Sequence, residues 1–347
     1  MPEQPVVLSE ATRKPEDRAD RGAAQPAPVR APRPVGAAVE RFALAGLLVL
    51  LFAVCAIFIP AFRSWGVITA MVNSQAIVLL LALTATIVLR TGNFDLSIPA
   101  VMVTSAAIVA VMSRDGYAPA LVVLCVLMAA LVVGLVNALL VVKIGVDSFI
   151  TTLGMFTALT GIGYALTDSK IVTGVPDVFI ELARAKLLGI PATTWYSWFL
   201  ILILWYVYER TPLGRYLLFI GGNPDAARLA GIKVDRIRLG AFVASAVIAA
   251  VIGILLAGNL GAIDPGIGTQ YLLAPFAAVF LGATAISVGR FNSVGTAVAL
   301  YLLAVGITGL QLLGAQTWVN NVFNGVALML AVALAKLAGR RRSRAAS

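Results

Sequence analysis

The chain has no histidine, only two cysteines and few charges for its length. Of its 347 residues, 12% are Asp, Glu, Lys or Arg, whereas 60% are hydrophobic. Cys55 and Cys125 lie within apolar runs and lack CxxC spacing, so neither a disulfide framework nor a histidine-based metal site is expected. The sequence also lacks a Gly-Lys-Ser/Thr phosphate loop and a histidine-containing triad, so we expect no cofactor, metal or catalytic residues. The remaining signal is apolar sequence, which predicts an integral membrane protein.

The apolar sequence divides into about ten runs, which predicts an all-α polytopic membrane protein. Pro99, Pro275 and several glycine-rich interruptions predict that some of the helices are broken or re-entrant. The predicted spans are residues 42–62, 72–90, 96–113, 118–142, 148–167, 196–208, 239–257, 271–288, 291–313 and 318–337.

Both ends of the chain differ in composition from this membrane domain, which covers residues 39–338. Residues 1–38 are rich in Pro, Ala, Arg and Glu, which predicts a disordered tail. The first apolar run begins only at Phe42, too late for a cleaved signal peptide, so we expect this span to be retained. Residues 339–347 form a short basic tail.

The formal net charge is +10, but the basic residues lie in the tails and loops rather than on one helix face. This arrangement does not favour a nucleic-acid partner. If both termini are cytoplasmic, the N-terminal tail, the central loop and the C-terminal tail place most of the Lys and Arg residues inside. The positive-inside rule therefore predicts cytoplasmic termini and a cytoplasmic central loop, residues 209–238.

Within this loop, residues 223–231 have the signals of a short helix with a defined beginning and end. Asn223 suits the N-cap, Pro224 the first helical position, and Asp225 the positive end of the helix dipole. Gly231 can adopt the left-handed conformation that ends a helix. About seven helical residues span roughly 10 Å, too little to cross a bilayer, so we predict a helix outside the membrane.

Asp95 and Ser97 lie in a second polar stretch, RTGNFDLSIPA, residues 90–100. One interpretation is structural: Asp95 caps the helix that follows and the segment acts as a hinge. The other is functional, because an acidic residue at membrane depth is a candidate substrate site.

Further polar residues within the spans are candidates for a route taken by a hydroxylated solute. Alternatively, they bond to their own helix backbone or allow close helix packing. The candidates are Asn73, Gln75, Thr84, Thr86, Thr104, Ser105, Asn137, Thr151, Thr152 and Thr160.

Several segments between about residues 65 and 337 together resemble the ribose-type sugar permeases of ABC importers. Asp225-Ala-Ala with Gly231 and the basic residues after it resembles their EAA-type loop, and RTGNFDLSIP resembles their Gly-Gly-Ile-Asp-Leu-Ser signature. DSFITTLGM, residues 147–155, and TPLGRY with IGGN, residues 211–223, match in order and spacing. The sequence departs from the usual family motifs at a few positions: Ile98-Pro99 replaces Val-Gly, and Ala283, Val288 and Phe291 stand where glycines are common. These differences suggest a divergent subgroup.

The resemblance implies a permease subunit in the bacterial inner membrane and no enzymatic activity of its own. Two copies would surround a central path, a cytoplasmic ABC ATPase would drive transport, and an extracytoplasmic sugar-binding protein would deliver the sugar or polyol. The ATPase would contact the coupling helix, for which the candidate residues are Asn223, Pro224, Asp225, Ala226, Ala227, Arg228, Leu229 and Gly231. We expect Ala226, Ala227, Leu229 and Ala230 to form its apolar docking surface, oriented by Asp225 and Arg228.

Two rival functions remain open. An ion-coupled secondary transporter would need an intramembrane ionisable residue, for which Asp95 is the main candidate. An integral membrane enzyme would need clustered catalytic residues. Within the ABC importers, a branched-chain amino acid is the alternative substrate.

Overall fold

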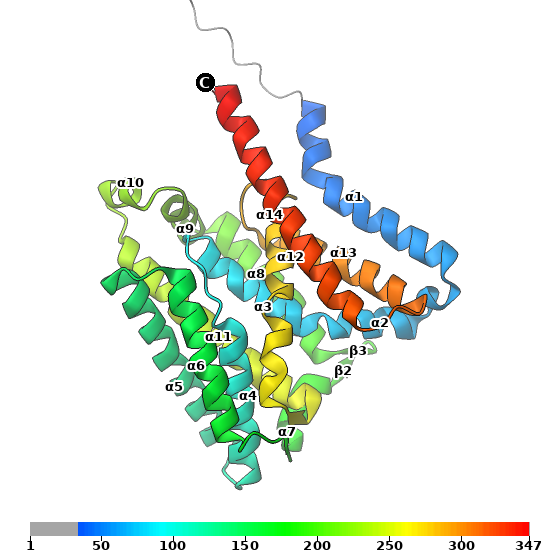
Figure 1. Cartoon of the computed structure of the whole chain (residues 1–347), viewed down its shortest axis with the longest axis vertical. Helices are drawn as coiled ribbons and strands as arrows, with labels where there is room; N and C mark the ends of the chain where they lie inside the picture. Colours follow the sequence, from blue (N-terminus) through cyan, green and yellow to red (C-terminus); the bar gives the residue numbers. More distant parts are fainter. Residues whose placement is uncertain (1–33, 347) are drawn as a thin grey trace, which may run out of the picture.

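The computed structural model describes residues 34–346, and side chains within residues 41–333. It is an all-α bundle with two very small sheets (Figure 1). The first half of the described chain contains α1 (Pro34–Phe58), η1 (Pro60–Arg63), α2 (Trp65–Ser74), α3 (Ala76–Leu89), α4 (Ile98–Arg114), α5 (Pro119–Ala138), η2 (Leu139–Ile144) and α6 (Ser148–Leu166). The middle contains β1 (Val172–Thr173), α7 (Asp177–Arg184), β2 (Lys186–Leu187), β3 (Ile190–Pro191), α8 (Ala192–Arg210), α9 (Pro212–Gly222) and α10 (Pro224–Leu229). The last part contains α11 (Val234–Leu260), β4 (Ala262–Ile263), η3 (Pro265–Tyr271), α12 (Ala274–Gly282), α13 (Ser293–Leu312) and α14 (Trp318–Ala346).

Helices α3, α4 and α11 form the centre of the bundle. Helix α11 packs against α3, α4, α5 and α7. Small residues allow these helices to approach closely, as is usual where lipid offers no hydrophobic driving force between helices. A Cβ on Gly253 of α11 would collide with the carbonyl oxygen of Met102 in α4, and a Cβ on Gly134 of α5 would lie 2.9 Å from the Cα of Val243.

The two ends of the bundle carry different structures. Helix α10, the beginning of α1 and the end of α14 lie at one end, the top of Figure 1, and α7 lies at the other. Near α7, β1 pairs with β4 in antiparallel register, Val172 opposite Ile263, and β2 pairs with β3, Lys186 opposite Pro191. The end that carries α10 is therefore also the end at which the described chain begins and ends.

Within the described part of the chain, six helical segments are long and apolar enough to cross a membrane: Arg41–Phe58, Trp65–Leu89, Pro119–Ile144, Ser148–Leu166, Val234–Leu260 and Ser293–Leu312. Ile98–Arg114 and Trp318–Ala333 are apolar but shorter. The all-α polytopic fold is thus confirmed, whereas the count of ten spans is not.

The eighth predicted span, residues 271–288, is the clearest difference. Its α-helical part, α12, has only nine residues and would rise about 14 Å, less than half of a hydrocarbon core of about 30 Å. Pro275 is in its first turn, where proline is tolerated, so the helix cannot continue back into η3. A turn-rich segment follows Gly282. A broken helix is therefore present here. Pro99, by contrast, lies at the start of α4 and interrupts no helix.

Helical structure extends into both predicted tails. Helix α1 begins at Pro34, a residue suited to a first helical position, and α14 continues to Ala346 through a segment rich in Ala and Arg, which are strong helix formers. The remainder of the predicted N-terminal tail, residues 1–33, lies outside the described residues.

Candidate functional site

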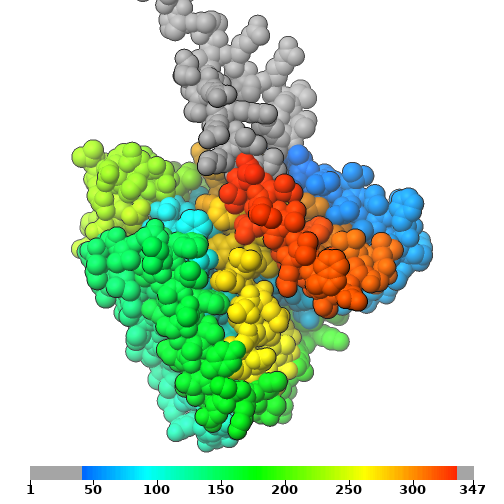
Figure 2. Space-filling view, viewed as in Figure 1, coloured from blue at the N-terminus to red at the C-terminus, as the bar shows by residue number. Residues whose placement is uncertain are grey.

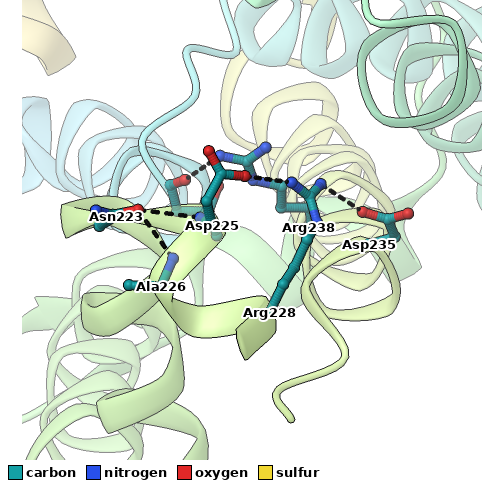
Figure 3. Close-up of polar contacts among 7 residues, drawn as sticks. Asn223, Asp225, Ala226, Arg228, Asp235 and Arg238 are labelled. Atoms are coloured by element: carbon teal, nitrogen blue, oxygen red, sulfur yellow. Dashed lines mark hydrogen bonds and ion pairs between the residues drawn. The ribbon is translucent and has the colours of Figure 1, made fainter. Parts of the chain in front are cut away.

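Helix α10 begins and ends as its sequence predicts. The Asn223 side-chain oxygen accepts hydrogen bonds from the backbone N–H groups of Asp225 at 3.1 Å and Ala226 at 3.0 Å (Figure 3). Pro224 occupies the first helical position, and Gly231 has a φ of +79°, in the left-handed region. The N-cap satisfies two of the N–H groups that a helix leaves unpaired at this end, and Pro224 has no N–H to satisfy. The result is a separate helix projecting beside the bundle, visible as a lobe at the upper left of Figure 2.

The two faces of α10 differ, and the structure corrects one detail of the expected docking surface. Ala227 is fully buried in a small apolar cluster with Ile220 and Val234, so it faces the protein. Leu229 is 91% exposed, and Ala230 is exposed beside it. The four apolar residues therefore do not share one exposed surface: Ala227 holds the helix to its own loop, and Leu229 and Ala230 are presented outward.

Arg228 fixes α10 to the beginning of α11. Its guanidinium contacts Asp225 at 2.9 Å and Asp235 at 3.1 Å (Figure 3). Hydrogen bonding to Asp235 is the largest effect that raises the pKa of Arg228. Asp235 also lies 3.8 Å from the Lys143 ammonium at the end of η2. Single exposed ion pairs contribute little to stability, but a guanidinium shared by two carboxylates restricts the orientation of the helix.

The segment that carries α10 is in backbone contact with the turn after α3. A Cβ on Gly221 would collide with the carbonyl oxygen of Arg90, and a Cβ on Gly92 would lie 3.4 Å from the carbonyl oxygen of Gly221. The Arg238 guanidinium donates to the Thr91 carbonyl at 3.3 Å. No side chain separates the two segments at Gly221, so their backbones are in direct contact.

Asp95 lies a few residues after this turn and is 2% exposed. Its Oδ1 accepts hydrogen bonds from the Ser97 backbone N–H at 3.1 Å and the Ser97 hydroxyl at 2.6 Å, and its Oδ2 accepts from the Ser245 hydroxyl at 2.6 Å. Asn137 of α5 donates to the Ser97 hydroxyl oxygen at 2.9 Å. The carboxylate therefore joins the beginning of α4 to α11, and the Ser97 hydroxyl connects it to α5.

Helix α6 is bound to the same segment through backbone groups. The Phe94 N–H donates to the Ser148 hydroxyl and the Leu96 N–H to the Thr152 hydroxyl, each at 3.0 Å. Together with the Asp95 bonds, these contacts connect residues 94–97 to α4, α5, α6 and α11. We call this set of residues, Asp95, Ser97, Asn137, Ser148, Thr152 and Ser245, the Asp95 network.

The structure does not bring all the predicted path residues together. Asp95, Ser97 and Thr152 belong to the network, and Thr151 lies beside Thr152 with its hydroxyl unpaired among the described residues. Asn73 and Gln75 lie at the junction of α2 and α3, and α2 lies far from α6 in Figure 1. The six residues therefore form two separate groups rather than one path.

Arg90 and Ser245 are the residues whose place the sequence did not reveal. The Arg90 guanidinium lies 3.9 Å from the ring centre of Tyr208 and donates to the Phe291 carbonyl at 2.9 Å. Arg90 is 5% exposed and joins α3, α8 and the approach to α13. The only local signal for Ser245 is a polar residue inside an alanine-rich span, which is equally typical of helix packing.

Comparisons with known proteins agree with this architecture. Residues 67–332 match the family described as branched-chain amino acid transport system / permease component. The chain is 34% identical to the ribose import permease protein RbsC of Bacillus subtilis (strain 168), over 83% of this chain and 90% of the relative. It is 30% identical to the RbsC of Escherichia coli (strain K12), over 85% and 92%, and 29% identical to the autoinducer 2 import system permease protein LsrC of Photorhabdus laumondii, over 81% and 85%.

No solved structure matches the chain. The family match covers most of the sequence and includes the Asp95 network and α10. The relatives that it matches are permease subunits, as the resemblance of its motifs indicated. The chain therefore belongs to the branched-chain amino acid transport system / permease component family.

Proposed function

We propose that this chain is the membrane-spanning subunit of an ATP-driven importer, and that α10 is the helix that contacts a separate ATPase. The observation that carries the proposal is α10 itself: a capped helix outside the apolar bundle, fixed by Arg228, with Leu229 91% exposed. An exposed leucine on a well-anchored helix can gain free energy by burial in an apolar groove of a partner, the usual way in which a helix docks into a groove. The docking face consists of Leu229, Ala230 and the exposed part of Arg228.

The contacts of α10 suggest how a movement of the ATPase reaches the spans. Displacement of α10 moves α9, and Gly221 then presses directly on the Arg90–Gly92 turn. This turn leads within a few residues to Asp95, which is bonded to α4 and α11. Because the backbones of Gly221 and the Arg90–Gly92 turn touch directly, the displacement does not have to pass through long, flexible side chains. The Asp95 network thus acts as a hinge, the structural interpretation of this segment.

A sugar of the ribose type is the proposed substrate, because relatives across most of the chain carry the name ribose import permease. A second copy of the chain would complete the path, a sugar-binding protein would deliver substrate at the end near α7, and both termini would be cytoplasmic. A branched-chain amino acid remains the alternative substrate, from the family description. Counterflow of labelled ribose and leucine by the complete transporter in proteoliposomes would separate the two.

The test of the ATPase contact is co-purification with partners from the native membrane, followed by an ATPase assay. Leu229→Arg is expected to release the ATPase, because it places a charge in an apolar groove while leaving the buried Ala227 face intact. Leu188→Arg is the matched control: Leu188 is 78% exposed and lies in the β2–β3 turn, far from α10. Retention of the ATPase by the Leu229→Arg protein would contradict the proposed docking face.

An ion-coupled carrier makes a different prediction in the same preparation. That function needs Asp95 to gain and lose an ion, yet its carboxylate already accepts three hydrogen bonds and is 2% exposed. Solute uptake driven by a proton or sodium gradient, with no ATPase present, would favour the carrier and refute the importer.

A further inference from the structure

A pocket of about 380 Å³ opens at the end of the bundle that carries α10, between the beginning of α1, the end of α8 and the segment that joins α12 to α13. Its volume lies within the range of about 300–1,000 Å³ that is usual for small-molecule sites. None of the contacts described for α10 or the Asp95 network involves it. Its lining includes Arg41, Trp205, Glu209, Arg210, Ser287 and Ser293.

Ser293 indicates that the pocket is built to receive a polar group. It is 2% exposed, and its hydroxyl has no hydrogen-bond partner among the described residues. Buried polar groups are almost always paired, because an unpaired one costs about 1–3 kcal/mol. Its neighbour Asn292 is fully engaged, since it caps α13 and donates to three backbone carbonyls. The Ser293 hydroxyl is thus a buried polar group of this wall that has no partner among the described residues and can pair with a ligand.

The charges around the opening have a pattern that fits one class of ligand. Arg41 and Arg210 supply two guanidinium groups and Glu209 one carboxylate, and none of the three has an ion-pair partner within the described part of the chain. Two arginines suit a phosphate, which they can bind with paired hydrogen bonds. The carboxylate suits an ammonium group carried by the same molecule. We propose that this pocket binds the headgroup of a phospholipid that carries both a phosphate and an amine, of the phosphatidylethanolamine type.

The surroundings favour a lipid over a soluble phosphate ester. Trp205 is 39% exposed at the rim, with the Arg210 guanidinium 5.6 Å from its ring centre, an arrangement typical of the membrane interface. Below the rim, the sides of α1 and α8 remain apolar and open: Phe42 is 53% exposed and Leu202 is 61% exposed. Acyl chains attached to a headgroup in the pocket would lie along these surfaces. Basic pockets between membrane helices are known to hold lipid headgroups in this way.

The far wall of the pocket is held in place by α1. Ile286 has a φ of +60°, unusual for a β-branched residue, and its N–H donates to the Arg41 carbonyl at 2.9 Å. This bond connects α1 to the segment before α13. A headgroup bound between Arg41, Arg210 and Ser293 would reinforce the same connection, so lipid and α1 would stabilise each other.

Native mass spectrometry of the full-length permease in detergent, titrated with defined lipids, tests the proposal. We expect one phosphatidylethanolamine to bind per chain in preference to phosphatidylglycerol, with soluble phosphoethanolamine and inorganic phosphate binding far more weakly. Arg41→Gln and Arg210→Gln should each weaken phosphatidylethanolamine binding about tenfold through loss of a charge-assisted contact. Glu209→Gln should abolish the preference over phosphatidylglycerol while keeping lipid binding.

Two exposed arginines provide controls of the same chemistry outside the pocket: Arg215→Gln on α9 at the same end and Arg63→Gln beside the exposed Trp65. Equal binding by the pocket variants and these controls would overturn the proposal. Equal affinity for lipid and soluble phosphoethanolamine would overturn the lipid assignment. If an arginine variant fails to fold, Ser293→Ala, which removes only the unpaired hydroxyl, and the lipid preference of the unmodified protein decide the matter.

Discussion

Substitution of Asp95 separates a hinge from a transport site, because the structure predicts different losses for two variants. In Asp95→Ala, the Ser97 N–H and the Ser97 hydroxyl both lose their acceptor, while Ser245 can still donate to the Phe242 carbonyl at 3.0 Å. Two unpaired buried donors at about 1–3 kcal/mol each give an expected destabilisation of about 2–6 kcal/mol. This is a large share of the stability of a typical protein.

Asp95→Asn should cost much less. The new amide retains one oxygen for the two Ser97 donors, and its N–H₂ faces the Ser245 hydroxyl, which can accept this bond while donating to Phe242. The expected destabilisation is then the difference in strength between hydrogen bonds to a charged carboxylate and hydrogen bonds to a neutral amide, about 1 kcal/mol or slightly more.

Both variants can be measured by denaturant unfolding in detergent and by ATP-driven uptake in proteoliposomes. The hinge interpretation expects Asp95→Asn to remain folded and to retain substantial transport, and Asp95→Ala to be strongly destabilised. Ser113→Ala provides a control for the loss of a buried hydroxyl outside the network. An Asp95→Asn protein of unchanged stability with no transport would refute the reasoning and assign the carboxylate a direct role in transport.

Three further substitutions test the link from α10 to the spans. Leu229→Ser should weaken ATPase binding about 10- to 100-fold, the loss of about 1.5–3 kcal/mol of leucine burial, while thermal unfolding stays unchanged; equal affinity in a binding titration would argue against contact. Gly221→Val should destabilise the protein and lower uptake per ATP because its Cβ meets the Arg90 carbonyl, whereas Gly222→Val, with no atom within 4 Å of its Cβ, should resemble the unmodified protein. Gly231→Val should leave the protein inserted but uncouple ATP hydrolysis from uptake, because a β-branched residue is strained at a φ of +79°; normal coupling would contradict this, and Gly231→Asn should be milder.

Features with a local cause were predictable from the sequence. The N-cap, the first-position proline and the left-handed glycine of α10 each depend on one residue and its immediate neighbours, and all three occur as expected. The all-α membrane fold was equally accessible, because apolar run length reflects the thickness of the bilayer. The structure of residues 271–288 was not, since an apolar run has the same composition whether it forms one long helix or a short helix followed by turns.

Features that depend on distant partners were not predictable. Helix α10 has six residues, fewer than two turns, so its sequence contains too little periodicity to tell that Ala227 faces inward and Leu229 outward. Asp95 and Ser245 are 150 positions apart, and either could have faced the path or another helix. The contact between Gly221 and Arg90 is between backbones, so it cannot be predicted from the pattern of side chains in the sequence.

Helix α11 connects the two ends of the bundle. Its 27 residues extend about 40 Å, and it is held at both ends: Asp235 contacts Arg228 near α10, and Gly258 packs against the Phe179 carbonyl of α7. Between these ends, Ser245 donates a hydrogen bond to Asp95, and the backbone of Gly253 packs closely against the Met102 carbonyl. Because these four contacts belong to one continuous helix, a push on the loop beside α10 would reach α7, at the opposite end of the bundle, through α11 itself.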